Sequence, residues 1–131
     1  MFQAIRKAEL ACEMLPDGAT VRIDRFTAFE PDALVRCGPP LEADAVETPD
    51  PIVVVEVLSP STRNYDAGAK LAGYFTLSSI RHYLMVDPDR RVIVHHRRDG
   101  DAIATRIIGS GSLRLDPPGL DVSVADMLGP E

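Results

Sequence analysis

A single carboxylate interrupts an apolar stretch near the middle of the chain. Residues 52–58 read Ile-Val-Val-Val-Glu-Val-Leu, and Glu56 is their one charged member. A run this rich in Val and Ile, with Pro51 before it and Pro60 after it, is typical of a strand covered on both faces. Because a buried carboxylate is unfavourable without a cation or a hydrogen-bond donor beside it, the sequence predicts a partner for Glu56.

Asp32 and Lys70 could meet Glu56 at the end of this strand. Asp32 begins a predicted strand over 32–36, and antiparallel pairing of the two strands would place the start of one beside the end of the other. Lys70 lies in a predicted helix over 65–77, from which it could reach back. Two carboxylates and a lysine could hold a hard divalent cation together with a substrate phosphate. The chemistry would be phosphodiester hydrolysis, with the lysine stabilising the pentavalent transition state.

Two other acids compete for a place in such a site. Asp50 follows a proline, but it precedes Glu56 by six residues on one strand, which separates the two by roughly 20 Å. We therefore reject Asp50 as a shared metal ligand and prefer Asp32. Asp66 shares a helix stripe with Lys70 at a spacing of four residues, and its place near the helix N-terminus favours a dipole interaction over metal ligation.

Structural interpretations exist for the same residues. Glu56 and Lys70 could form a buried ion pair without any catalytic role. Asp32 could serve the turn chemistry common at strand starts, and Tyr74, on the same helix stripe, is interpreted as a packing residue. The three histidines fall at no zinc spacing and neighbouring strand residues point to opposite faces, so they are interpreted as structural or surface residues: His82, His95 and His96.

The composition suits one compact domain over residues 1–131. With 45% hydrophobic residues the chain can bury a core, and its net charge of -6 argues against a protein that grips long duplex nucleic acid through a generally basic surface. No apolar run approaches the length of about 18 residues that crosses a membrane. Cys12 and Cys37 lie outside any CxxC motif, so we expect small core cysteines in a soluble cytoplasmic protein.

Periodicity predicts a mixed α/β (α+β) order of elements. An amphipathic helix over 2–15 carries Glu9 and Glu13, whose contribution to a site is left open. The further predicted elements, in chain order, are strands over 20–26, 32–36 and 52–58, a helix over 65–77, a hairpin of 80–87 with 91–96, strands over 103–108 and 113–115, and a short tail over 122–128. We expect no second domain.

Several motifs together resemble a known family. They are Pro31-Asp32, the block Val54-Val55-Glu56-Val57-Leu58-Ser59-Pro60-Ser61-Thr62, the spaced Asp66 and Lys70, and Tyr83-Leu84-Met85-Val86-Asp87-Pro88. This set looks like the Uma-type restriction-endonuclease-like family of the PD-(D/E)XK nuclease superfamily. The resemblance covers nearly the whole chain, and it implies a restriction-endonuclease-like core with a mixed central sheet and flanking helices.

The resemblance also implies a function. It implies an endonuclease that hydrolyses DNA with Mg²⁺ or Mn²⁺, with Asp32 and Glu56 as metal ligands. The superfamily usually has its lysine two residues after the strand acid, where this chain has Leu58, so the catalytic lysine is expected to be Lys70. The chain also starts close to the family's first helix, which predicts a member without the usual N-terminal segment. A homodimer is expected for such a core.

Two other classes of protein remain as alternatives. The first is a nuclease-like fold without catalysis that serves as a nucleic-acid-binding or protein-interaction module. The second is a purely structural protein that forms a dimer. Metal binding that depends on Glu56 separates the enzyme from both.

Overall fold

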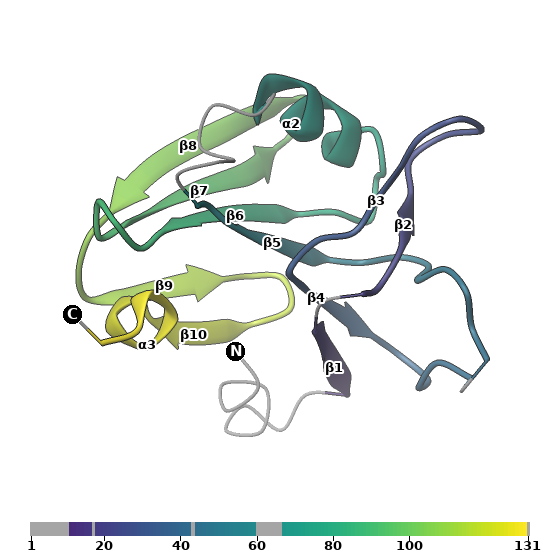
Figure 1. Cartoon of the computed structure of the whole chain (residues 1–131), viewed down its shortest axis with the longest axis horizontal. Coiled ribbons are helices and arrows are strands. Elements are labelled where there is room, and N and C mark those ends of the chain that lie inside the picture. Colours follow the sequence, from purple (N-terminus) through teal and green to yellow (C-terminus); the bar gives the residue numbers. More distant parts are fainter. Residues whose placement is uncertain (1–10, 17, 43, 60–66, 131) are drawn as a thin grey trace.

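A mixed sheet of six strands forms the centre of the molecule (Figure 1). The computed structural model describes residues 11–16, 18–42, 44–59 and 67–130. The strands are ordered β1-β4-β5-β6-β7-β8; β5 and β6 run parallel and the other neighbours antiparallel. The elements are β1 (Cys12–Pro16), β2 (Val21–Arg22), β3 (Ala28–Phe29), β4 (Ala33–Cys37), β5 (Val53–Val57), α2 (Ala67–Phe75), β6 (His82–Asp87), β7 (Val92–Asp99), β8 (Ala102–Ile108), β9 (Ser112–Leu115), β10 (Leu120–Ser123) and α3 (Val124–Leu128).

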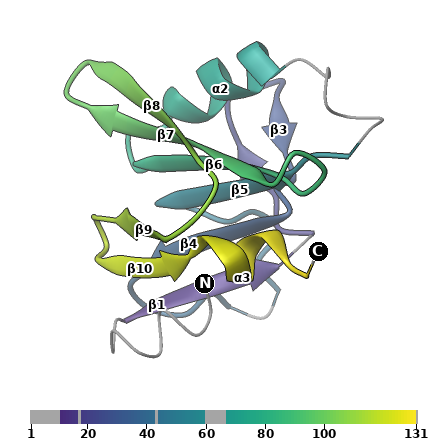
Figure 2. The same cartoon turned by 90° about the vertical axis from the view of Figure 1, so that its left-hand side faces the viewer.

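Each face of the sheet packs against its own set of elements. Helix α2 lies over one face, and α3 with the β9–β10 pair lies over the other (Figure 2). Because strand side chains alternate, β5 contributes to both cores: Val54 packs with Tyr74 and Tyr83 on the α2 side, whereas Val53 and Val55 join the core that contains α3. Glu56 therefore belongs to the α2 side, and the predicted doubly covered strand is confirmed.

The predicted helix over 2–15 is wrong in its C-terminal part. Residues 12–16 form β1, which pairs antiparallel with β4. The side chains of Cys12 and Met14 pack on the α3 side while that of Leu15 packs on the α2 side, which is the alternation of a strand. Strand pairing overrode a local pattern that suits either structure. The rest of this predicted helix, residues 2–10, lies outside the described residues.

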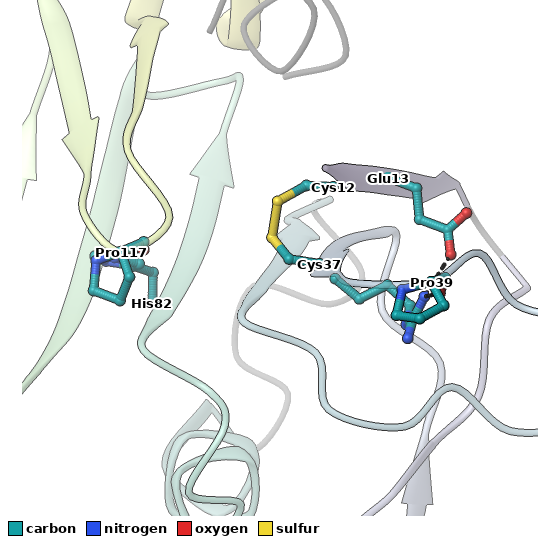
Figure 3. The surroundings of a disulfide bond; sticks show 7 residues. Cys12, Glu13, Cys37, Pro39, His82 and Pro117 are labelled. Carbon is teal, nitrogen blue, oxygen red and sulfur yellow. Dashed lines mark hydrogen bonds and ion pairs between the residues drawn. A yellow bond between two sulfur atoms is a disulfide. The ribbon is translucent and has the colours of Figure 1, made fainter. Parts of the chain in front are cut away.

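The interpretation of Cys12 and Cys37 as separate core thiols is also wrong. The two residues are register partners across β1 and β4, and a disulfide joins them (Figure 3). Their 25-residue separation in sequence gave no sign of the pairing, which only the strand register creates. A cross-link over a loop of this length restricts the unfolded chain, an effect worth roughly 3 to 4 kcal/mol in the chain-entropy account.

The remaining elements follow the prediction, with one exception. Strands over 32–36 and 52–58 and the hairpin of 80–87 with 91–96 are confirmed, with bounds that differ by one or two residues except at the end of β7, which continues three residues further to Asp99. The predicted strand over 20–26 is cut short after Arg22 by a tight turn, and the chain returns as β3. The tail divides into β10 and α3, with the Ser123 hydroxyl accepting a bond from the Asp126 amide at the helix start. No helix in the described part of the chain has the length and apolar character needed to cross a bilayer.

A pair of buried histidines lies on the α3 side of the sheet. His82 Nε2 lies 2.9 Å from the Pro117 carbonyl oxygen and His82 Nδ1 lies 2.9 Å from His95 Nε2. Because a carbonyl only accepts, a neutral His82 donates from Nε2 and accepts at Nδ1, so His95 donates from Nε2. His95 Nδ1 is then an unprotonated, buried atom without a partner among the described residues.

Both histidines resist protonation. Burial lowers the pKa of His82. Burial is the main cause that lowers the pKa of His95 to about 4, and the charges of Arg106 and Arg97 add to it. The native fold therefore holds a neutral pair, in agreement with their interpretation as structural residues.

The free energy of unfolding is expected to fall as the pH drops from about 6.5 toward about 4. In this window unfolded His95 binds a proton and folded His95 does not, so acid favours the unfolded state, and the stability is complete above the unfolded pKa. Urea denaturation at a series of pH values measures the effect. His95→Gln should show a weaker pH dependence than the parent, since it removes the titrating group; equal slopes for the two proteins would contradict the assignment.

Candidate active site

The pairing of β4 with β5 places Asp32 beside Glu56. The two strands are antiparallel with Ala33 opposite Val55, so the residue before β4 lies across from Glu56. The antiparallel pairing on which the sequence argument depended is present. The start of β4 and the end of β5 thus bring two acids together at one end of these two interior strands.

The backbone of β5 fixes the position of the Asp32 carboxylate. Its Oδ2 accepts a hydrogen bond of 2.6 Å from the Val57 amide, and the residue is half-buried. This bond is charge-assisted and satisfies an amide beyond the last β4–β5 register pair. Asp32 therefore has a defined orientation beside Glu56, and its second carboxylate oxygen adds acceptor capacity at the same place.

Two side chains from α2 form hydrogen bonds with the Glu56 carboxylate. Lys70 Nζ lies 3.0 Å from Glu56 Oε2, and the Tyr74 hydroxyl donates to Glu56 Oε1 at 3.0 Å. The Glu56 side chain is 12% exposed and that of Lys70 is 24% exposed. Each oxygen of the buried carboxylate therefore has a charged or hydroxyl partner, as burial demands. The predicted contact of Lys70 with Glu56 is confirmed.

Tyr74 was interpreted as packing only, and this interpretation is incomplete. The ring is fully buried in the α2-side core, but its hydroxyl bonds Glu56. The sequence carried a signal for this contact, because Tyr74 follows Lys70 by one helical turn and lies on the same stripe. A buried tyrosine usually finds a partner for its hydroxyl, and Glu56 was the acid within reach of this stripe.

The two acids act electrostatically on the same tyrosines. Burial raises the pKa of Tyr74, and the negative charges of Glu56 and Asp32 raise it further. The pKa of Tyr83 is raised by the same three causes in the same order. Both phenols therefore stay protonated, which keeps Tyr74 a donor. Strand alternation places both acids on the face that carries Leu34 and Val54, which is the α2 side.

Strand β3 holds α2 in place through Phe29. Its ring lies 5.0 Å from that of Tyr74 at 62°, an edge-on contact, and Lys70 Nζ lies 5.9 Å from its centre. The ring fits against the helix at Gly73, where a Cβ would lie 2.9 Å from Phe29 Cε2. The absence of a side chain at Gly73 is what allows this close approach. Phe29 thus orients both α2 residues that contact Glu56.

The other candidate acids lie apart from this cluster. Asp50 lines a cavity of about 340 Å³ near the start of β5, with Arg22, Glu47 and Ser78 among its walls. Arg36 Nη1 donates a hydrogen bond of 2.9 Å to Glu13 Oε1. Glu13 lies opposite Arg36, which is near the end of β4 that is distant from Asp32.

Asp66 and Glu9 fall outside the described residues. Leu58, two residues after Glu56, packs into the α2-side core. The lysine that contacts Glu56 comes from α2.

The donor set suits a hard divalent cation in its number and kind. Mg²⁺ is commonly held by one or two carboxylates with water and substrate oxygens completing its shell, and Asp32 and Glu56 supply two. A carboxylate has about four lone-pair sites, so the bonds from Val57, Lys70 and Tyr74 leave acceptor capacity. No group of three or more His, Cys, Asp or Glu residues suited to a metal occurs in the described ranges, so a cation here would depend on few protein ligands.

Known proteins resemble this chain in sequence and in fold. The Uma2 family, described as "Putative restriction endonuclease", matches residues 2–125. An uncharacterised protein of Synechocystis sp. (strain ATCC 27184 / PCC 6803 / Kazusa) is 35% identical over 96 residues, covering 72% of this chain and 50% of that protein. The chain therefore spans about half the length of that curated relative.

A solved structure shares the fold. The crystal structure of a protein from Anabaena variabilis ATCC 29413, described as a putative nuclease belonging to DUF820, matches with a TM-score of 0.74 at 15% identity. The match covers 96% of this chain and 72% of that one. The predicted mixed α+β, nuclease-like fold is confirmed.

Gly73→Ala is expected to destabilise the protein by about 1–3 kcal/mol, because the new methyl group must displace Phe29. Gly68→Ala is a matched control in the same helix. A Cβ there meets nothing within 4 Å, so the helix propensity of alanine should stabilise the protein by up to about 1 kcal/mol. Urea denaturation compares the two variants. Equal stability of both would contradict the role assigned to Phe29.

Proposed function

Because the chain belongs to the Uma2 family of putative restriction endonucleases, we propose that it is a metal-dependent endonuclease that hydrolyses DNA phosphodiester bonds. The family description and the Anabaena variabilis structure, described as a "putative nuclease", support the nuclease class. The observation that carries the proposal is the cluster at the end of β5. There Asp32, just before β4, lies across from Glu56 in β5, and Lys70 forms an ion pair with Glu56.

Asp32 and Glu56 would hold the cation, which we take to be Mg²⁺ or Mn²⁺. When bound, such a cation supplies Lewis-acid activation of water and of the phosphate. The Val57 amide orients Asp32, and the Tyr74 hydroxyl orients Glu56. These two bonds come from the backbone of a central strand and from a fully buried ring, so the ligands are held without the cation.

Lys70 is the cationic residue of the proposed site. Its ammonium group lies beside Glu56, at the edge where a phosphate would approach the two acids. We assign it the stabilisation of negative charge that develops on the phosphate in the transition state. Its position on α2 depends on the packing of Phe29 against that helix, so the β2–β3 pair supports the site from outside the sheet.

The second candidate is a nuclease-like fold that binds nucleic acid or protein without cleaving DNA. A specific observation favours it: both Glu56 oxygens already have partners, Lys70 and Tyr74. A carboxylate neutralised in this way forms a stable structural pair. The two candidates differ in whether a divalent cation binds at Glu56.

We also propose that the protein forms a homodimer through β8. Among the described strands β8 pairs only with β7, and its seven residues carry one charge and no proline. Such an edge is open to pairing with another strand. In a two-fold antiparallel pairing centred on Thr105, Ile103 lies opposite the partner's Ile107 and Arg106 opposite the partner's Ala104. This register joins the exposed apolar residues and keeps the arginines from facing each other directly.

Size-exclusion chromatography with light scattering tests the dimer. The parent protein should have the mass of a dimer, and Ile107→Lys should shift it to a monomer, since Ile107 is 71% exposed on β8. Val46→Lys is the control, because Val46 is 84% exposed in a separate loop and should leave the dimer intact. A monomeric parent would rule out this proposal.

Substitutions at the three site residues should separate metal binding from chemistry. Glu56→Gln and Asp32→Asn should remove binding of Mn²⁺ in calorimetry and abolish cleavage of supercoiled plasmid. Lys70→Met should keep metal binding and lower the cleavage rate by about 10²- to 10³-fold, the loss typical for one stabilising group. Asp50→Asn, which changes an acid near the other end of β5, should change neither property.

The enzyme proposal fails if the parent protein binds neither Mg²⁺ nor Mn²⁺. Cleavage that survives in both Glu56→Gln and Lys70→Met would show that the site lies elsewhere. Glu56→Gln keeps a group that can accept from Tyr74, and a thermal melt of each variant separates loss of folding from loss of binding.

A further inference from the structure

The turn between β2 and β3 presents an aromatic ring to solvent. Phe26 is 88% exposed, the highest exposure of any large hydrophobic side chain in the described residues. Exposing a phenylalanine to this extent forfeits the free energy that burial would provide. The ring is therefore available to a ligand.

The turn itself is well ordered by internal hydrogen bonds. The Asp24 carboxylate accepts from the Phe26 amide at 2.8 Å, and the Ile23 amide donates to the Thr27 carbonyl at 2.9 Å. These bonds close the turn and fix the backbone of Phe26. Because these bonds already fix the main chain of the turn, a ligand that binds there has little backbone to order.

A cation accompanies the ring. The Arg25 guanidinium carbon lies 5.6 Å from the centre of the Phe26 ring, within the range of a cation–π contact. An exposed aromatic ring beside an arginine is the combination on which proteins stack unpaired bases, while the arginine meets the backbone phosphate. The neighbouring acid, Asp24, accepts the hydrogen bond from the Phe26 amide that closes the turn.

The turn is close to the proposed active site. Phe29, three residues after Phe26, packs on Tyr74 and lies near Lys70, so the Cα atoms of Phe26 and Phe29 are at most about 10 Å apart. Figure 1 shows the β2–β3 pair projecting beyond the sheet on the side where α2 lies. A strand of DNA with its phosphate at Lys70 could place a base a few nucleotides away on Phe26.

We propose that Arg25 and Phe26 form a binding site for the unpaired bases of single-stranded DNA, with Phe26 stacking on a base and Arg25 contacting phosphate. This inference rests on the proposed nuclease function, for which it names the substrate class. An unpaired base has an exposed face that a single ring can cover, whereas duplex binding depends mainly on many phosphate contacts. The net charge of -6 disfavours a broad duplex-binding surface and favours a local contact of this kind.

Fluorescence anisotropy with a labelled oligothymidylate of about 12 nucleotides tests the site, in EDTA so that no cleavage occurs. Phe26→Ala should weaken binding by about 5- to 150-fold, the loss expected for one stacked base. Phe26→Tyr should bind as the parent does, because it keeps the ring. Val46→Ala, at a residue 84% exposed outside this turn, should also match the parent.

The outcomes separate this inference from the nuclease proposal. Phe26→Ala binding as tightly as the parent, or a parent that binds no oligothymidylate, overturns the inference even if plasmid cleavage persists. An equal loss of affinity for the matching duplex also overturns it, because Phe26 would then act as a duplex wedge. Ring-dependent binding in a protein that binds no metal would support the inference and reject the nuclease.

Discussion

The neutralisation of Glu56 is the constraint on which the α2 side of this molecule depends. A carboxylate at the end of a central strand, with 12% of its side chain exposed, requires partners within about 3 Å for both oxygens. Lys70 and Tyr74 provide them from one stripe of α2, so the helix must lie over the end of β5 with that stripe facing inward. The side chain of Phe29 and the missing Cβ of Gly73 then set how the helix meets β3.

The two faces of the sheet differ in the polarity of the side chains that cover them. The α3 face is closed by apolar side chains from β9, β10 and α3, and its polar exceptions are the neutral histidines His82 and His95, bonded to each other and to Pro117. The α2 face gathers the charged cluster at one edge and leaves the Arg25–Phe26 turn exposed beside it. The sheet thus has an apolar packed layer on its α3 face and a charged cluster at the end of β5 on its α2 face.

Much of the candidate site follows from sequence because strand geometry is simple. Alternation places Glu56 on one face, antiparallel pairing brings Asp32 beside it, and helical spacing aligns Lys70 with Tyr74. The disulfide and the strand character of residues 12–16 did not follow. Both depend on β1 pairing with β4, a contact between residues 25 positions apart at Cys12 and Cys37, and local periodicity contains no record of such a partner.

The sequence by itself determined that β5 is buried, that its one acid needs a cation, and that Asp32 and Lys70 are available to meet it. These conclusions rest on local rules of period and on the high cost of a buried charge. Only the tertiary structure decided that Tyr74 holds the second oxygen of Glu56, that Phe29 fits against Gly73, and that Phe26 stands exposed. The first two are contacts between segments far apart in the chain, and all three features depend on how whole elements pack.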